Sequence, residues 1–221
     1  MSQLRFVTAA SLFDGHDVSI NIIRRLLQSR GVEVIHLGHN RSALEVVSAA
    51  LQEDVHAVAL SSYQGGHNEY FAYIRELLNQ AGASNIKIFG GGGGVITPTE
   101  IKVLESRYGI EKIYTPDDGS TLGLDGIIDD MIKRASGSTL DGIDLTKLHR
   151  TAQVGNLDHP QLAKIITEIE DLGNSAPTGT DCNTPVLGIT GTGGAGKSSL
   201  IDELLLRFHH HLSDKKIALI S

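Results

Sequence analysis

The 221-residue chain has a single cysteine, Cys182, no run of basic residues and no long apolar stretch. One cysteine excludes an intrachain disulfide and is typical of a reducing compartment, so we predict a cytoplasmic protein. A formal net charge of −7, without clustered Lys and Arg or base-stacking aromatics, argues against a nucleic-acid partner. No segment approaches the roughly 18 apolar residues of a membrane span, and the amino terminus does not resemble a signal peptide, so we predict no membrane partner.

What the chain does contain is an apolar segment followed by a helical pattern, repeated five times. With 40% apolar residues it can bury a core. The strands are expected at residues 4–10, 32–37, 57–63, 86–89 and 112–114, with helices between them and a last helix from about 121 to 134. Ser42 and Pro98 stand where helices are expected to begin. This alternation predicts an α/β fold, a doubly wound parallel sheet with the flavodoxin-like order 2-1-3-4-5.

Polar or glycine residues follow three of these strands. Asp14 and His16 lie in the loop after the first strand, Ser61 ends the third, and Gly90-Gly91 follows the fourth. In the order 2-1-3-4-5 these three strands are neighbours, and ligands bind beyond their carboxyl ends. Each group alone is usually an ordinary turn. Together, three groups on adjacent strands predict one binding site.

The spacing of these groups is specific. Asp14-x-His16 begins a six-residue motif, residues 20–60 separate it from Ser61, and residues 64–89 lead to Gly90-Gly91. This resembles the pattern D-x-H-x-x-G, 41 residues, S-x-L, 26 to 28 residues, G-G of the cobalamin-binding domain in the methylmalonyl-CoA mutase and methionine synthase families. Two positions depart from the pattern, with Ser19 in place of glycine and Tyr63 in place of leucine.

The resemblance implies a role for each position. His16 would be the lower axial ligand of cobalt in adenosylcobalamin, with Asp14 accepting the other imidazole N–H, an arrangement that fixes the tautomer and raises basicity. Ser61 would hydrogen-bond the displaced dimethylbenzimidazole tail, above a pocket shaped by Tyr63. The glycine pair Gly90-Gly91 would leave room for the tail. His16 is then a cofactor ligand, and no acid–base catalytic residue is predicted.

A change of composition near residue 135 predicts the domain limits. Residues 1–136 would form the cobalamin-binding domain, and residues 137–184 a linker with Gly- and Ser-rich ends. One amphipathic helix is expected within the linker, where a single apolar stripe needs a surface to pack on; the stripe consists of Leu162, Ile165, Ile166, Ile169 and Leu172.

Residues 185–221 contain a second motif, G-x-x-x-x-G-K-[ST], the phosphate loop of NTPases. A strand is expected at 186–190, a helix after the loop, and a strand at 216–220. Lys197 would reach the β and γ phosphates, and the Ser198 hydroxyl would bind Mg²⁺. The predicted nucleotide-binding residues are Gly191, Gly193, Gly194, Ala195, Gly196, Lys197, Ser198 and Ser199. Because no Walker B carboxylate follows, we expect an amino-terminal fragment with a truncated P-loop domain.

The order of the parts resembles the family of isobutyryl-CoA mutases fused to their G-protein chaperone, over essentially all 221 residues. That resemblance implies radical interconversion of isobutyryl-CoA and n-butyryl-CoA, with cofactor loading gated by GTP and Mg²⁺. It also implies a homodimer and an acyl-CoA-binding barrel that this chain lacks.

Two alternatives from other classes remain open. One is a cobalamin-binding regulator or corrinoid methyl-transfer module, which the phosphate loop disfavours. The other is a receiver-like domain fused to an ATPase, but a receiver needs an aspartate where residues 61–63 read Ser-Ser-Tyr. Among the other histidines, His67 could approach the cofactor or begin a helix on the surface, and His209–His211 is a remote candidate for metal binding.

Overall fold

Five parallel strands form the central sheet in the order β2-β1-β3-β4-β5. This confirms the predicted flavodoxin-like order. The strands are β1 (Arg5–Ser11), β2 (Glu33–Arg41), β3 (Ala57–Ser61), β4 (Lys87–Gly91) and β5 (Lys112–Tyr114). The computed structural model describes residues 3–137, 159–172, 185–215 and 217–220.

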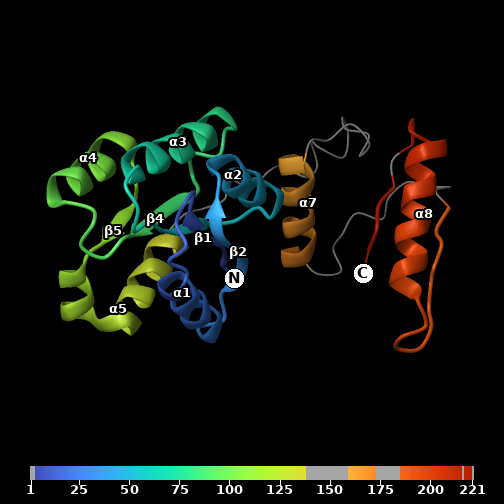
Figure 1. Cartoon of the computed structure of the whole chain (residues 1–221), viewed down its shortest axis with the longest axis horizontal. Coiled ribbons are helices and arrows are strands. Elements are labelled where there is room, and N and C mark those ends of the chain that lie inside the picture. Colours follow the sequence, from blue (N-terminus) through green and yellow to red (C-terminus); the bar gives the residue numbers. More distant parts are fainter. Residues whose placement is uncertain (1–2, 138–158, 173–184, 216, 221) are drawn as a thin grey trace. The chain divides into compact units, whose positions relative to one another are not determined.

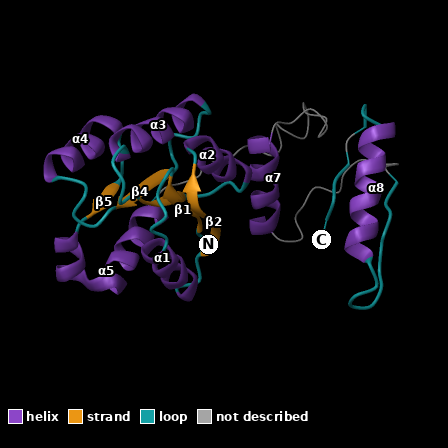
Figure 2. Ribbon diagram, viewed as in Figure 1, coloured by secondary structure: helices purple, strands orange, loops and turns teal. Residues whose placement is uncertain are grey.

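Helices cover both faces of the sheet (Figures 1 and 2). On one face lie α1 (Val18–Ser29) and α5 (Pro116–Ser136), and on the other lie α2 (Ala43–Gln52), α3 (His67–Gln80) and α4 (Pro98–Tyr108). Because every strand is parallel, each connection passes over a face through one of these helices. The carboxyl ends of β1, β3 and β4 therefore meet at one edge.

Three of these helices, α2, α4 and α5, begin after a residue whose side chain caps the helix amino terminus. Ser42, Thr97 and Thr115 each accept a hydrogen bond from a backbone N–H three residues later and form a complete capping box. The last of these starts α5 at Pro116, earlier than the predicted residue 121. This helix is bent near its amino terminus, because Gly123 has non-helical angles, with φ 66° and ψ 173°.

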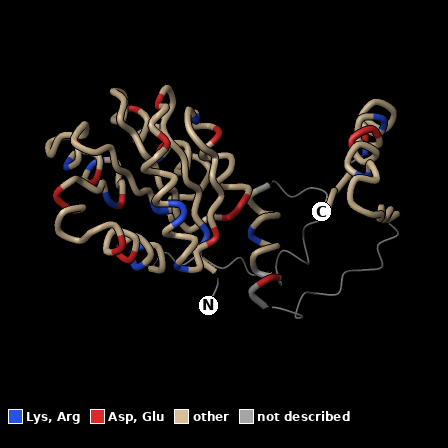
Figure 3. Tube along the Cα trace, turned by 60° about the horizontal axis from the view of Figure 1, so that its bottom comes forward, with Lys and Arg blue, Asp and Glu red and all other residues tan. Residues whose placement is uncertain are grey.

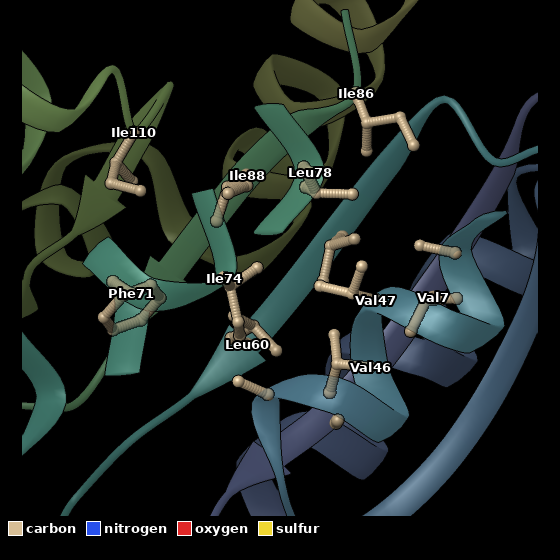
Figure 4. Close-up of a cluster of buried hydrophobic side chains, with 14 of the residues drawn as sticks. Val7, Val46, Val47, Leu60, Phe71, Ile74, Leu78, Ile86, Ile88 and Ile110 are labelled. Atoms are coloured by element: carbon tan, nitrogen blue, oxygen red, sulfur yellow. The ribbon is translucent and has the colours of Figure 1, made fainter. Parts of the chain in front are cut away.

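Two apolar clusters flank the sheet. The larger one joins β-strand residues to α2, α3 and α4, and its side chains point toward one another in Figure 4; they include Val7, Val46, Val47, Leu60, Phe71, Ile74, Leu78 and Ile88. The smaller cluster lies under α1 and α5. There β3 contributes only Ala57 and Ala59. Such small side chains leave space between this face of the sheet and its helices.

The helix predicted within the linker is α7 (His159–Leu172), and it packs on α2. Thr167 is buried, and its hydroxyl accepts a hydrogen bond of 3.3 Å from Arg5 at the start of β1. Arg5 also lies 3.5 Å from Glu170. Contacts accordingly divide the chain into units Met1–Asn174 and Ser175–Ser221. The rest of the predicted linker, 138–158 and 173–184, lies outside the described residues, and the domain limits at 136 and 184 stay predictions.

In the second unit, α8 (Lys197–His211) begins directly after Gly196, as the phosphate-loop pattern predicts. The strands expected at 186–190 and 216–220 are wrong for the described residues, which form no strand at 186–190 or 217–220. A strand needs a neighbour to pair its backbone groups, and the described part of this unit provides none.

Figure 3 shows Lys and Arg interspersed with Asp and Glu along the first unit. Among the described residues, no helix is both long and apolar enough to cross a membrane.

Candidate functional site

The loop after β1 is held in a fixed shape by backbone contacts. Phe13 adopts a left-handed conformation, with φ 63°, and its N–H donates to Asn40 Oδ1 at 2.8 Å. The N–H of Asp14 bonds to the Ser11 carbonyl at 3.1 Å, which closes a turn. The turn directs the Asp14 side chain inward and leaves His16 outside.

Asp14 ties this loop to the end of β3. Its side chain is fully buried, and Oδ1 lies 2.8 Å from His16 Nδ1 and 2.9 Å from the His16 backbone nitrogen. Oδ2 accepts the N–H of Tyr63. Burial alone raises the pKa of Asp14, but the hydrogen bonds from Tyr63 and His16 outweigh it, so the pKa lies below its usual 3.8.

An ionised carboxylate can only accept, so Nδ1 of His16 carries a proton, and in the neutral imidazole the lone pair is then on Nε2. The imidazole is 66% exposed. The ring of Tyr63 lies against it, with centroids 5.6 Å apart and planes at 45°. The backbone at Gly93 supports Tyr63, since a Cβ there would lie 2.9 Å from the tyrosine ring. His16 is thus an oriented imidazole with a free nitrogen directed away from its carboxylate.

A cavity of about 310 Å³ opens beside this loop, between the ends of β3 and β4 and the helices α1 and α5. Its walls are mostly apolar; they include Ile20, Ile23, Phe89, Leu124, Ile127 and Met131. Ser61 also lines it, with its hydroxyl 3.5 Å from that of Ser19. The structure therefore brings Asp14, His16, Ser61, Tyr63 and the glycine pair to one sheet edge.

The two predicted glycines have different roles. A Cβ on Gly90 would lie 2.6 Å from both Phe71 and Ile113, on the α3 face and not in the cavity. Gly91 alternates with Gly90 and shares the face of Phe89, and its Cβ would meet only the Tyr114 carbonyl at 3.6 Å. Both glycines line the cavity, so the expectation that they leave room for a ligand stays a prediction for each. Glycine at position 90 is required by core packing as well.

These residues fit a cobalamin. An imidazole nitrogen is a good ligand for a borderline transition ion such as cobalt, and the Asp14 contact fixes its tautomer. A deep slot with aromatic and aliphatic walls suits a flat bicyclic tail, and the Ser61 hydroxyl offers a hydrogen bond within it.

The remaining histidines lie elsewhere. His67 begins α3 and is buried, with Nε2 3.3 Å from Glu100 Oε1, so it faces α4, and it is not among the residues that line the cavity. His209–His211 ends α8. Within the described ranges no group of three or more His, Cys, Asp or Glu side chains could hold a metal ion, and the remote metal site is not supported.

The phosphate-loop residues form a second candidate site. Gly194 and Gly196 adopt left-handed φ values of 75° and 80°, and α8 starts at the next residue, Lys197. Lys197 Nζ donates to the carbonyls of Gly191 and Thr192 at 2.8 and 2.7 Å. Gly193 and Ala195 lie within this loop, and Ser198 and Ser199 lie in the first turn of the helix. The loop thus ends at a helix amino terminus, where backbone N–H groups favour an anion.

Comparison with known proteins agrees with this geometry. The family described as "B12 binding domain" matches residues 4–111. A fused isobutyryl-CoA mutase of Cupriavidus metallidurans is 54% identical over 231 residues, covering 100% of this chain and 20% of that protein. One from Geobacillus kaustophilus is 50% identical, covering 99% and 21%. The chain belongs to the fused isobutyryl-CoA mutase family. It spans about a fifth of the length of these family members.

A shorter relative matches about half of this chain. The 2-hydroxyisobutanoyl-CoA mutase small subunit of Aquincola tertiaricarbonis is 31% identical over 114 residues, covering 52% of this chain and 82% of that subunit. Among solved structures, a cobalamin-binding protein from Desulfitobacterium hafniense has a TM-score of 0.50 at 19% identity, covering 60% of this chain and 59% of that one. The methanol:cobalamin methyltransferase complex of Methanosarcina barkeri has a TM-score of 0.51 at 20% identity, covering 69% and 53%. The two structures confirm the fold.

Two features of the site are not predicted by the sequence. The backbone N–H of Tyr63 donates a hydrogen bond to Asp14, in addition to the contact of the Tyr63 ring with His16. A sequence motif cannot indicate this bond, because every residue except proline has a backbone N–H. Ser19 faces Ser61 across the cavity edge. The departure from the family pattern at position 19 is the available signal, but the small size of serine does not by itself indicate a hydroxyl contact.

Proposed function

We propose that the first unit binds adenosylcobalamin, with His16 as the lower axial ligand of cobalt and the tail of the cofactor in the cavity beside Ser61 and Gly91. The observation that carries this proposal is the buried Asp14, which holds an exposed imidazole with its free nitrogen outward next to an apolar slot. Tyr63 and Gly90 support the site through the His16 ring and the core.

We further propose that the chain serves an acyl-CoA mutase that interconverts isobutyryl-CoA and n-butyryl-CoA. When bound, adenosylcobalamin supplies a cobalt–carbon bond whose homolysis drives radical rearrangement. The chain's own residues ligate, orient and enclose the cofactor. The identity of 50–54% across the P-loop as well as the first unit supports this proposal over a corrinoid methyl-transfer module or a receiver.

For the second unit we propose binding of GTP with Mg²⁺, which would gate cofactor loading. Lys197 would exchange its two loop carbonyls for phosphate oxygens, and Ser198 would ligate the ion. The domain limits 1–136, 137–184 and 185–221, a substrate-binding barrel elsewhere in the protein, a homodimer and a cytoplasmic location belong to the same proposal.

The decisive experiment asks which nitrogen ligates cobalt. Protein labelled uniformly with ¹⁵N is mixed with unlabelled cob(II)alamin, and the electron paramagnetic resonance spectrum is recorded. A protein ¹⁵N ligand splits each cobalt line into two, whereas the cofactor's own ¹⁴N base splits it into three. We expect doublets for the wild type and for His39→Ala, which removes another exposed histidine, and none for His16→Ala. Triplets in the folded wild type, or doublets in His16→Ala, would contradict the proposal.

A further inference from the structure

The cavity contains a pair of hydroxyl groups that are not fully used within the protein. Ser61 is the last residue of β3 and is 6% exposed, and Ser19 is the second residue of α1. Their oxygens are 3.5 Å apart. Within the part of the chain that the structure describes, neither hydroxyl makes another hydrogen bond.

Proton counting shows what the pair can offer. Each serine has one O–H proton, and one of the two is used between the oxygens, so one donor remains. A buried donor without an acceptor is unfavourable, so this proton needs a partner that the protein does not supply. The nearby hydroxyls of Tyr114 and Thr115 differ, because they already donate to Asp130 and Asp118 at 2.9 and 2.8 Å.

Burial decides the direction of the bond between the serines. Ser19 is only half-buried, so its oxygen can still accept from water when its proton is given to Ser61. Ser61 is 6% exposed and lines the cavity, so the acceptor for its proton must lie within the cavity. The favoured arrangement is therefore Ser19 donating to Ser61, with the Ser61 proton directed into the cavity.

We propose that Ser19 is a positioning residue that orients the Ser61 hydroxyl toward an acceptor nitrogen in the ring of the cobalamin tail. This inference rests on the proposed cobalamin site and goes beyond it, because it names a residue where the family pattern has glycine, which has no hydroxyl.

The location of Ser19 gives the contact a second consequence. Ser19 follows His16 by three residues, at the start of α1. One short segment thus holds both the proposed cobalt ligand and the group that orients the tail. A tail seated at Ser61 therefore stabilises the segment that presents the imidazole.

The test compares two probes, adenosylcobalamin and adenosylcobinamide, which lacks the tail nucleotide. Dissociation constants are measured by equilibrium dialysis for the wild type, Ser19→Ala, Ser19→Thr and Ser61→Ala. We expect Ser19→Ala to weaken cobalamin binding about 3- to 10-fold, the effect of one hydrogen bond, without changing cobinamide binding. Ser19→Thr retains the hydroxyl and should restore cobalamin affinity. In a Ser61→Ala background, Ser19→Ala should have no further effect.

Three outcomes would overturn the inference: equal weakening of both probes, no weakening of either, or additive effects of the two alanine substitutions. Failure of the cobalamin site itself is recognised separately. In that case the wild type would bind cobalamin no more tightly than cobinamide and would show no ¹⁵N doublets, before any serine is changed.

Discussion

The chain has two glycine-rich segments, residues 90–94 at the end of β4 and in the loop after it, and residues 191–196. They need glycine for different physical reasons, and they are called the first and the second loop below. In the first loop a Cβ would collide with neighbours at three positions: on Gly90 it would lie 2.6 Å from Phe71, on Gly92 2.1 Å from the Ser62 carbonyl, and on Gly93 2.9 Å from the Tyr63 ring. Of these three glycines only Gly93 also has a left-handed φ, of 58°. In the second loop a Cβ on Gly194 or Gly196 would meet nothing within 4 Å, but both residues have left-handed φ.

The difference separates a loop built by packing from one built by backbone conformation. The first loop lies against β3 and the core, so its shape is fixed before any ligand arrives. The second keeps its backbone N–H groups accessible next to a helix amino terminus, which suits the binding of a phosphate. Substitutions in the first loop should therefore reduce stability, and substitutions in the second should reduce ligand affinity.

The largest effect is expected for Gly92→Ala. The contact at 2.1 Å involves backbone, which cannot rotate away as a side chain can. We expect the free energy of unfolding of the first unit to fall by about 3 kcal/mol, at the upper end for overpacking. Denaturant unfolding followed by circular dichroism measures it.

Gly91→Ala is the matched control, because its Cβ would make only an ordinary contact at 3.6 Å. It should change the stability by less than about 0.5 kcal/mol. Equal destabilisation by the two substitutions would show that packing does not determine this loop, and the comparison between the two loops would fail.

The next effect concerns the second loop. Alanine at position 196 would have to adopt φ 80°, which costs about 1 kcal/mol relative to glycine. Gly196→Ala should therefore weaken binding of a fluorescent GTP analogue about five-fold, measured by titration, with little change in cobalamin binding. Gly193→Ala is the control, because Gly193 has no left-handed φ and no atom within 4 Å of its Cβ. A stronger effect at 193 than at 196 would contradict the conformational explanation.

The contrast between the loops also shows how far the sequence can lead. Periodicity predicts the sheet order, and the spacing of Asp14, His16 and Ser61 predicts that they meet, because the carboxyl ends of parallel strands share an edge. The presence of glycine in a sequence, however, does not indicate whether side-chain packing or the backbone conformation requires it. Gly90 lines the cavity, where the family pattern expects a ligand contact, but Phe71, from a distant helix, also requires glycine at this position.

Other features depend on partners that no local pattern reveals. The apolar stripe of α7 predicts packing on some surface, but not the buried contact of Thr167 with Arg5, 162 residues away. The strand expected at 186–190 is absent for the opposite reason: its composition suits a strand, but no neighbour in the described residues pairs with it. Tertiary partners decide both cases.

The smallest expected effect concerns two charged side chains, Asp14 and Lys197, each of which hydrogen-bonds to backbone groups. Asp14 links the loop after β1 to Tyr63, and its pKa lies below 3.8, since the hydrogen bonds that it accepts outweigh its burial. The stability that it contributes is fully present above pH 3.8 and is lost as the pH falls through its folded pKa. In the second loop, Lys197 donates hydrogen bonds to backbone carbonyl groups, which have no titratable proton.

Acid should therefore loosen the first region selectively. We expect wild type to be more stable than Asp14→Asn at pH 7. This difference in the free energy of unfolding should shrink as the pH falls below 3.8, because the unfolded chain then binds a proton at Asp14 more readily than the folded protein does. Asp117→Asn, at an exposed residue in the first turn of α5 that forms no ion pair within the described residues, controls for the substitution itself. A difference that stays constant between pH 7 and pH 3 would show that Asp14 holds the loop after β1 through its shape and not through its charge.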